Sequence, residues 1–211
     1  MRVVVCDPGV GNVRSVVRAI QRGLESAGRA CDVVVTRERA VVRGADFVVV
    51  PGQGAFGPFA RGIQGGLDDA LREHLDKGRP YLGICLGMQV LFESSEEAPG
   101  GEQGLGFLRG HVRRLDPGVD PATSRPYALP HIGWNTVEGT RAWASEPARH
   151  FYFANSYAAE PADASVICGT TEYGSARFTS AVAQGAVVGV QFHPEKSQRE
   201  GLALLARFFR L

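Results

Sequence analysis

The hydrophobic pattern of the first half of the chain alternates between short apolar runs and stretches with helical spacing. Runs of apolar, often β-branched residues predict buried strands at 3–6, 32–36, 46–50 and 81–84. Apolar residues on one face predict helices at 13–24 and 67–77, which Gly28 and Gly78 respectively end. Strands that alternate with helices are typical of a parallel sheet covered by helices on both faces. We therefore expect an open α/β sheet of three layers.

The second half of the chain carries strand patterns with fewer helices between them. Apolar and aromatic runs predict strands at 111–115, 151–157, 166–172, 178–183 and 186–192. Gln184-Gly185 fits a hairpin turn between the last two. The segment 116–130 is rich in Pro, Gly, Asp and Ser and predicts a long surface connection. The expected fold is a mostly parallel open sheet with a more antiparallel second half, in a single domain over 1–211.

One of the predicted strands leads directly into a candidate nucleophile. Cys85 follows the strand at 81–84, Gly83 and Gly87 flank it, and a helical pattern with Leu91 and Phe92 on one face follows. A strand, a sharp turn and a helix around a thiol are the arrangement of a nucleophile elbow. The positive end of the helix dipole would favour the thiolate. The alternative is a small, buried and inert cysteine, the commoner fate of a free cysteine.

The C-terminal segment contains a candidate base for that thiol. His193 ends an apolar strand, and in extended backbone Glu195, two residues later, would face the same side and orient the imidazole. Pro194 between them would keep the backbone extended. The alternative is a strand-end histidine beside a solvated glutamate. A helix follows, for which Ser197 and Glu200 predict a capping box.

The other four histidines are weaker candidates for a base. His74 is expected on a charged helix face, and His150 lies in a polar stretch. His111 and His131 lack a nearby acid that could orient the ring.

A glycine-rich loop at 51–58 follows the strand at 46–50. In open α/β sheets, ligands bind at the carboxyl ends of strands, so this loop could offer backbone N–H groups to a substrate. A plain turn is the alternative. The Gly9-x-Gly11 pair lacks the third glycine of a dinucleotide-binding loop, so that function is not expected.

Composition narrows the function classes further. The 211 residues have a net charge of +1, which gives no electrostatic case for nucleic acid or a membrane surface. No apolar run is long enough to span a membrane, and the N-terminus lacks a signal-peptide layout. The four cysteines are scattered without a CxxC pair, so we expect reduced thiols in the cytoplasm and neither a metal nor a cofactor.

Several motifs together resemble the class I glutamine amidotransferases over the whole chain. They are Asp7-x-Gly9-x-Gly11-Asn12, Pro51-Gly52-x-Gly54-Ala55-Phe56-Gly57, Gly83 to Gln89, Leu91 to Glu97, His131-Ile132-Gly133-Trp134-Asn135 and His193-Pro194-Glu195-Lys196-Ser197. The Cys and His-x-Glu pattern is shared by many amidotransferases. The His-Ile-Gly-Trp-Asn stretch is more selective and resembles one branch, the glutaminase subunits of imidazole glycerol phosphate synthase.

The resemblance implies a role for each of the site residues. Cys85 would attack the side-chain amide carbon of glutamine, His193 would shuttle protons and Glu195 would orient His193. The implied oxyanion donors are backbone N–H groups of Leu86 and of the loop at Gln53 and Gly54. The implied substrate contacts are Gly54, Gln89, Glu97, Ser156 and Tyr157, with Glu97 suited to the ammonium and the backbone of Ser156 and Tyr157 to the carboxylate.

The resemblance also implies a partner, a separate (β/α)₈ cyclase that would take up the ammonia, because no such barrel fits in this chain. The positions that match its interface are Asn12, His131, Trp134 and Lys196. Two residues depart from the family pattern: Gln53 replaces a small or β-branched apolar residue, and Pro8 replaces an aromatic one. The Gln53 departure puts the geometry of the oxyanion loop in question.

Three alternatives to this function remain open. A glutaminase serving another pathway would share Cys85, His193 and Glu195, but would not be expected to carry the His-Ile-Gly-Trp-Asn stretch. A catalytically dead scaffold is disfavoured because all three of those residues are present. A cysteine peptidase or γ-glutamyl hydrolase is disfavoured by Gln89, Glu97 and the interface stretch.

Overall fold

The computed structural model describes residues 1–7, 9, 13–139 and 149–211. Within these residues, twelve strands join one sheet, ordered β10-β9-β12-β13-β14-β4-β3-β1-β2, with β11, β6 and β5 branching from β13. The parallel strands are β1 (Arg2–Cys6), β2 (Asp32–Thr36), β3 (Phe47–Gly52), β4 (Tyr81–Cys85) and β14 (Val187–Val190). This part confirms the expected parallel sheet.

The other half of the sheet is antiparallel, as expected. It contains β9 (His131–Gly139), β10 (Arg149–Asn155), β12 (Ile167–Tyr173) and β13 (Ala176–Gln184). The branch contains β6 (Gly110–Arg114) and β11 (Tyr157–Pro161), which are antiparallel, and the two-residue β5 (Ser94–Ser95), which is parallel to β6. The predicted hairpin at Gln184-Gly185 joins β13 to β14.

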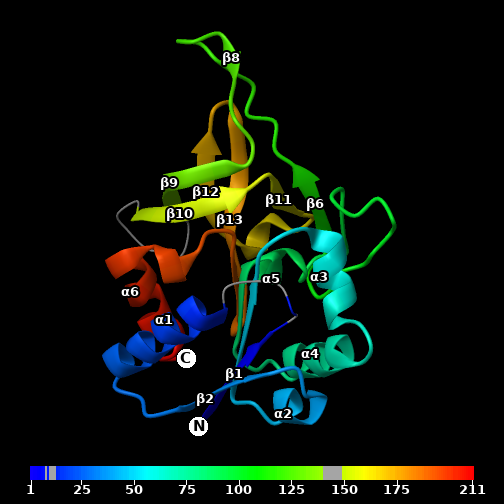
Figure 1. Ribbon diagram of the computed structural model, residues 1–211, viewed down its shortest axis with the longest axis vertical. Helices are drawn as coiled ribbons and strands as arrows, with labels where there is room; N and C mark the ends of the chain where they lie inside the picture. Colours follow the sequence, from blue (N-terminus) through cyan, green and yellow to red (C-terminus); the bar gives the residue numbers. More distant parts are fainter. Residues whose placement is uncertain (8, 10–12, 140–148) are drawn as a thin grey trace.

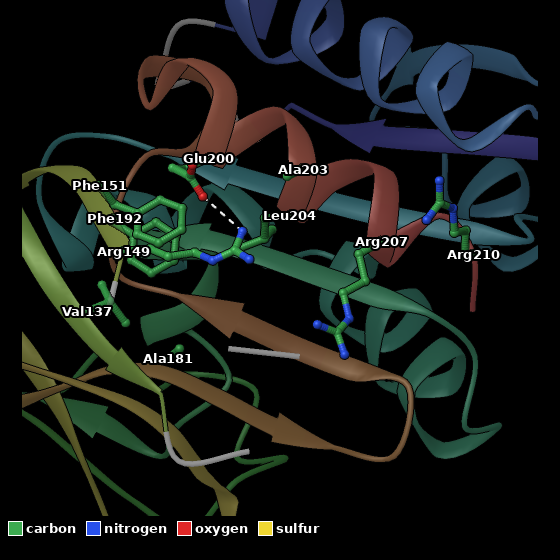
Figure 2. Close-up of a pocket in the computed structure, with 10 residues that line it drawn as sticks. All are labelled: Val137, Arg149, Phe151, Ala181, Phe192, Glu200, Ala203, Leu204, Arg207 and Arg210. Atoms are coloured by element: carbon green, nitrogen blue, oxygen red, sulfur yellow. Dashed lines mark hydrogen bonds and ion pairs between the residues drawn. The ribbon is translucent and has the colours of Figure 1, made fainter. Parts of the chain in front are cut away.

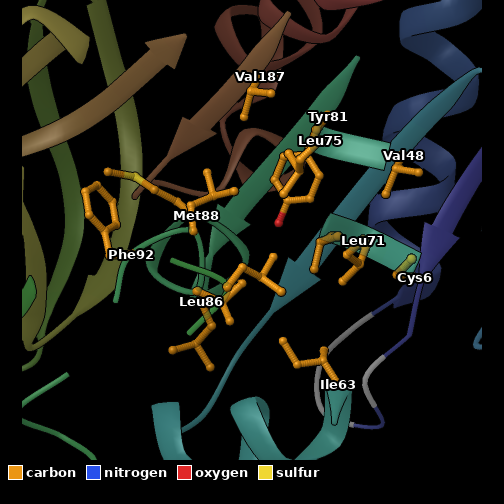
Figure 3. Close-up of a cluster of buried hydrophobic side chains, with 14 of the residues drawn as sticks. Cys6, Val48, Ile63, Leu71, Leu75, Tyr81, Leu86, Met88, Phe92 and Val187 are labelled. Carbon is orange, nitrogen blue, oxygen red and sulfur yellow. The ribbon is translucent and has the colours of Figure 1, made fainter. Parts of the chain in front are cut away.

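Helices cover the parallel part of the sheet on both sides (Figure 1). On one side lie α1 (Val13–Ala27) and α6 (Gln198–Phe208), and on the other α2 (Arg39–Arg43), α3 (Phe56–Ile63) and α4 (Leu67–Asp76). The sheet therefore separates two apolar clusters, one beneath each helical layer. Figure 3 shows the cluster beneath α3 and α4, where Tyr81 donates a hydrogen bond to the carbonyl of Gly87 at 2.8 Å. None of the described helices has the length and apolar character needed to cross a membrane.

Three local predictions were wrong. The helix after Cys85 is a single turn, α5 (Leu86–Gln89). The expected aromatic strand is two strands, β10 and β11, because the chain changes pairing partner at Ser156. The third error is the capping box.

The connection at 116–130 lies mostly on the surface, as expected. It contains a small hairpin, β7 (Val119–Asp120) with β8 (Arg125–Pro126), which projects from the top of the molecule (Figure 1).

The capping box is absent because both of its side chains bond elsewhere. The hydroxyl of Ser197 donates to the carbonyl of His193 at 2.6 Å and accepts the N–H of Tyr152 at 3.0 Å. Glu200 forms an ion pair with Arg149 at 2.9 Å. Ser197 therefore ties the segment after His193 to β10 instead of capping α6.

The expectation of an exposed His74 is also wrong. Its side chain is 1% exposed, and Nε2 lies 3.0 Å from the carbonyl oxygen of Pro80. Burial outweighs that hydrogen bond and lowers the pKa of His74, which favours the neutral ring. His74 thus belongs to the core face of α4.

Candidate active site

The candidate nucleophile lies at a tight junction of strand and helix. Cys85 is the last residue of β4 and has φ +54° and ψ −108°, a backbone conformation that is strained for a residue with a side chain. A Cβ added to Gly83 would collide with the backbone of Gly87, and one added to Gly87 would collide with the carbonyl of Val50. Only glycine allows this close approach, so the sequence produces a nucleophile elbow.

The candidate base reaches the thiol because β14 lies beside β4. The two strands are parallel, with Val190 opposite Ile84, so the residues that follow each strand meet at one edge of the sheet. Nδ1 of His193 lies 2.8 Å from Oε1 of Glu195, and both side chains are only 2% exposed. Since Nδ1 is bound to the carboxylate, the other ring nitrogen is left for the sulfur of Cys85.

Two contacts determine the charge of His193. Burial lowers the pKa of His193, but hydrogen bonds with Cys85 and Glu195, together with their negative charges, outweigh burial and raise it to about 9. The ring is therefore an imidazolium at neutral pH, next to the sulfur of Cys85. A histidine beside the sulfur is the arrangement that activates a cysteine nucleophile.

The expected contact between Glu195 and His193 is present, but the local backbone differs from the expectation. Pro194–Lys196 form one 3₁₀ turn, so Glu195 reaches back across a turn instead of along an extended strand. Proline suits the first position of such a turn because its missing N–H has no partner there in any case.

A pocket of about 190 Å³ opens beside Cys85 and gathers most of the residues that the resemblance assigned to substrate. It is lined by Gly54, Cys85, Leu86, Gln89, Glu97, Pro130, Ala154, Asn155, Ser156 and Tyr157. These residues come from the loop after β3, the elbow, the turn after β5, and the corner between β10 and β11. Segments far apart in the sequence thus meet at this pocket. Gln53 is half-buried and borders this pocket through its neighbour Gly54.

Two residues that line this pocket each have an acceptor atom without a hydrogen-bond partner among the described residues. The atoms are Oε1 of Gln89 and Oδ1 of Asn155, and both side chains are buried. A buried, unsatisfied acceptor is costly, so the structure carries this cost at the pocket wall.

The loop that would help to bind the oxyanion is held at both ends. Gly52 packs so tightly against Phe59 and Leu86 that a Cβ there would collide with both side chains. At the other end, Oε2 of Glu97 accepts the N–H of Phe56, the first residue of α3, at 2.8 Å. Gly54 between them has φ +101°, a conformation that favours glycine. Leu86 opens α5, where no earlier turn can accept its N–H. The oxyanion role of these groups stays a prediction.

The predicted interface residues divide into two kinds. Trp134 is 47% exposed and meets the ring of Tyr152 edge-on, and Nζ of Lys196 lies 5.7 Å from the centre of that ring. His131, by contrast, is 4% exposed and stacked between Phe153 and Tyr173, so it acts through packing. The other interface candidate, Asn12, and the departure at Pro8 lie outside the described residues.

Sequence reasoning missed two residues of the site. Asn155 lines the pocket at the corner between β10 and β11. Gln191 is fully buried, and its Nε2 lies 3.5 Å from the sulfur of Cys85. A signal for Gln191 was available: it is an amide in an apolar strand, two residues before His193.

A second hollow, of about 480 Å³, lies between the start of β10, the end of β14 and helix α6, with Phe192 in its wall (Figure 2). The stacked rings of Phe151 and Phe192 form its inner wall, and Arg149 is paired with Glu200 at its edge. None of Cys85, His193 and Glu195 lines it. Among the described residues, no group of three or more His, Cys, Asp or Glu could hold a metal ion.

Comparison with known proteins agrees with this geometry. Residues 10–211 match the family described as Glutamine amidotransferase class-I, and the chain belongs to that family. The fold is similar to that of a crystal structure of a glutamine amidotransferase, with a TM-score of 0.71 and 20% identity over 98% of this chain and 97% of that chain.

Several similar relatives are subunits of the same name. The chain is 43% identical to imidazole glycerol phosphate synthase subunit HisH of Rhodospirillum rubrum, covering 100% of this chain and 99% of the relative. It is also 43% identical to a subunit of that name in Thermus thermophilus, with 100% of both chains covered. The HisH subunit of Pyrococcus furiosus is 38% identical, over 100% of this chain and 99% of the relative.

Proposed function

We propose that this chain hydrolyses glutamine to glutamate and ammonia and delivers the ammonia to a separate cyclase subunit of imidazole glycerol phosphate synthase. The observation that carries the proposal is the meeting of Cys85, His193 and Glu195 at one edge of a pocket of about 190 Å³. Full-length identity of 43% to HisH subunits supports the role in histidine biosynthesis.

The reaction begins from the thiolate and imidazolium pair. The sulfur of Cys85 attacks the side-chain amide carbon of glutamine, and the carbonyl oxygen becomes an oxyanion. His193 donates its proton to the leaving nitrogen, so ammonia departs and a glutamyl thioester remains. His193, now neutral, takes a proton from a water molecule whose oxygen attacks the thioester. Glutamate leaves, and thiolate and imidazolium are restored.

The lining of the pocket supplies groups for each end of the substrate. The Glu97 carboxylate suits the ammonium of glutamine, and Gln89 lines the same pocket. Backbone N–H groups of Ser156 and Tyr157 would bind the substrate carboxylate. The N–H of Leu86 and one from Gln53 or Gly54 would bind the oxyanion. Removing one such donor typically costs about 3 kcal/mol of transition-state stabilisation.

The partner in this proposal is the (β/α)₈ cyclase, which would dock on the surface around Trp134 and Lys196. The exposure of Trp134 supports this assignment. All four cysteines are free thiols, which supports a reducing, cytoplasmic setting. The family match over 10–211 supports one amidotransferase domain over residues 1–211.

The decisive experiment removes the nucleophile and then supplies ammonia directly, so that glutamine hydrolysis is no longer needed. Cys85→Ala should abolish ammonia release from glutamine, while its complex with the cyclase should still form imidazole glycerol phosphate from an ammonium salt. The control is wild-type protein assayed with both nitrogen sources. Near wild-type glutamine hydrolysis by Cys85→Ala would remove the basis of the proposal.

A further inference from the structure

A chain of buried side-chain amides connects the substrate pocket to the nucleophile. Nε2 of Gln89 donates to the carbonyl of Tyr157 at 3.1 Å and to Oε1 of Gln191 at 2.9 Å. Nε2 of Gln191 then donates to the sulfur of Cys85 at 3.5 Å. Nδ2 of Asn155 donates to the same Tyr157 carbonyl, also at 3.1 Å. Gln89, Gln191 and Cys85 are buried, so water does not compete for these bonds.

The direction of this chain follows from its first atom. The carbonyl of Tyr157 can only accept, so Gln89 must turn its NH₂ group toward it. The same NH₂ group also faces Gln191, so Gln191 must offer its oxygen there. The NH₂ group of Gln191 is therefore left facing Cys85, and the sulfur receives a hydrogen bond. A reversed Gln191 amide would place two donor groups against each other.

We propose that Gln191 is a positioning residue that holds the sulfur of Cys85 as a hydrogen-bond acceptor and links it to the substrate-binding Gln89. A donor to sulfur favours the thiolate over the thiol, because only the thiolate accepts strongly. The bond also fixes the direction of the sulfur beside the pocket. The effect on turnover rests on the proposed glutaminase function, whereas the effect on the thiol does not.

Filling space in the core would not require an amide at position 191. The backbone N–H of Gln191 already donates to the carbonyl of Ser180 at 2.9 Å, so the strand ladder is complete without its side chain. Burying an amide is costly unless it is hydrogen-bonded. Both ends of the Gln191 amide are bonded, one to Gln89 and one to Cys85, as a connecting role requires.

The test measures the thiol in the free protein. Iodoacetamide alkylation of Cys85 is followed by peptide mass spectrometry from pH 5 to 10, because alkylation reports the thiolate. Gln191→Met keeps the length and apolar bulk of the side chain but removes the hydrogen-bond donor. It should move the midpoint of alkylation upward by about one pH unit. At pH values below the midpoint, this shift means a thiolate fraction about tenfold smaller than in wild type. Gln191→Glu presents a negative charge to the sulfur and should move the midpoint further.

The titratable groups around Cys85 are His193 with Glu195 behind it, and Glu97 and Tyr157 in the pocket. All of them stay in place in these variants. Ser180→Ala is the matched control, because Ser180 is equally buried on the adjacent strand and its hydroxyl has no partner among the described residues. Its alkylation midpoint should equal that of wild type.

Two outcomes would overturn the proposal. One is a Gln191→Met midpoint equal to that of Ser180→Ala; the other is a Gln191→Glu midpoint at or below that of wild type. Should Gln191→Met fail to fold, the near-isosteric Gln191→Glu decides alone. With glutamine and the cyclase, Gln191→Met should lower kcat by up to about tenfold at pH values below the alkylation midpoint of wild type, with recovery as the pH rises. A shifted midpoint in a protein that never hydrolyses glutamine would uphold Gln191 and reject the proposed function.

Discussion

At the residue scale, Glu195 and Cys85 have different effects on His193. The carboxylate of Glu195 binds Nδ1 and so fixes the orientation and the tautomer of the ring. The sulfur of Cys85 is the hydrogen-bond partner of the other ring nitrogen. The orienting group transfers no proton itself. Removing the His193 imidazole should therefore lower the rate of catalysis more than removing the negative charge of Glu195.

This difference can be measured by comparing two substitutions. His193→Ala should lower kcat for glutamine about 10³-fold or more, because it removes the proton carrier. Glu195→Gln should lower kcat by a factor roughly 10–100 times smaller than His193→Ala does, because the orienting carboxylate transfers no proton itself. Both are assayed as ammonia release in the presence of the cyclase, with melting temperatures as the control for folding. Equal residual rates would contradict the separate roles.

The sequence predicted the contact between Glu195 and His193 through two-residue spacing, although the backbone there is a 3₁₀ turn. His74 shows the opposite error. It shares helical spacing with Leu67 and Leu71, which places it on the core face, but its charged neighbours suggested a solvated side chain. Local charge was a poorer guide than periodicity. The partners of Gln191 could not be predicted, because they come from β4 and α5, about a hundred positions away in the chain.

At the element scale, α1 and α6 pack closely at one glycine. A Cβ added to Gly23 of α1 would lie 2.8 Å from Cβ of Leu205 in α6, closer than such atoms normally approach. Leu205 is buried and cannot move aside without shifting the helix. These two helices form the layer over β3 and β1, where Phe208 and Phe209 at the end of α6 pack on Phe47.

Gly23→Ala should therefore destabilise the fold by about 1–3 kcal/mol, the usual cost of overpacking, despite the better helix propensity of alanine. Urea unfolding measures this change in the free energy of unfolding. Gly44→Ala is the matched control, because its φ is −90° and its nearest neighbour would be in ordinary contact at 3.6 Å. A Gly23→Ala protein as stable as the control would show that α1 and α6 can separate freely.

The oxyanion loop is the element that the Gln53 departure affects. Gly52 and Gly54 on either side of Gln53 allow its peptide groups more than one orientation, and only an inward N–H would stabilise the oxyanion. The side chain of Gln53 could bond a loop backbone group and so bias that choice. A bias of about 1.4 kcal/mol changes a minor population roughly tenfold.

Gln53→Val should therefore change the ratio of cyclase-stimulated to basal glutamine hydrolysis more than it changes the stimulated rate itself. Ammonia release is measured for both proteins, with and without the cyclase and its nucleotide substrate. If the two ratios are equal, Gln53 is a neutral surface substitution.

Apolar strands could be predicted from the sequence, and short helices could not. The strands of the parallel half were expected within one or two residues, because each is a run of mostly apolar residues, which are β-branched in β1, β2 and β3. The runs in β1, β3 and β4 are buried, whereas the edge strand β2 is partly exposed. The helices α2, α3 and α5 have eight residues or fewer, too short for a period to be recognised. The break at Ser156 depends on pairing of β11 with β6, a contact that local patterns do not contain.

At the scale of the whole molecule, the predicted interface and the catalytic site share a strand. Trp134 on β9 lies directly opposite Tyr152 on β10, and their rings meet edge-on. The backbone carbonyl of Tyr152 accepts the N–H of His193 at 2.8 Å, and its N–H donates to the hydroxyl of Ser197. A partner that presses on Trp134 would thus act on the strand that holds the backbone of His193.

This connection predicts that Trp134→Ala uncouples the two subunits without unfolding this one. An aromatic side chain at the centre of an interface commonly contributes about 2 kcal/mol or more, so the Kd for the cyclase should rise at least about thirtyfold. Stimulation of glutamine hydrolysis at saturating cyclase should fall as well. The reason is that Tyr152 loses the Trp134 ring, through which a bound cyclase would act on it. The melting temperature should change little, since Trp134 is half-exposed. Val119→Ala, an exposed apolar residue on the distant β7 hairpin, is the control and should leave Kd unchanged. A large fall in melting temperature with an unchanged Kd would instead mean that Trp134 serves only to cover Tyr152.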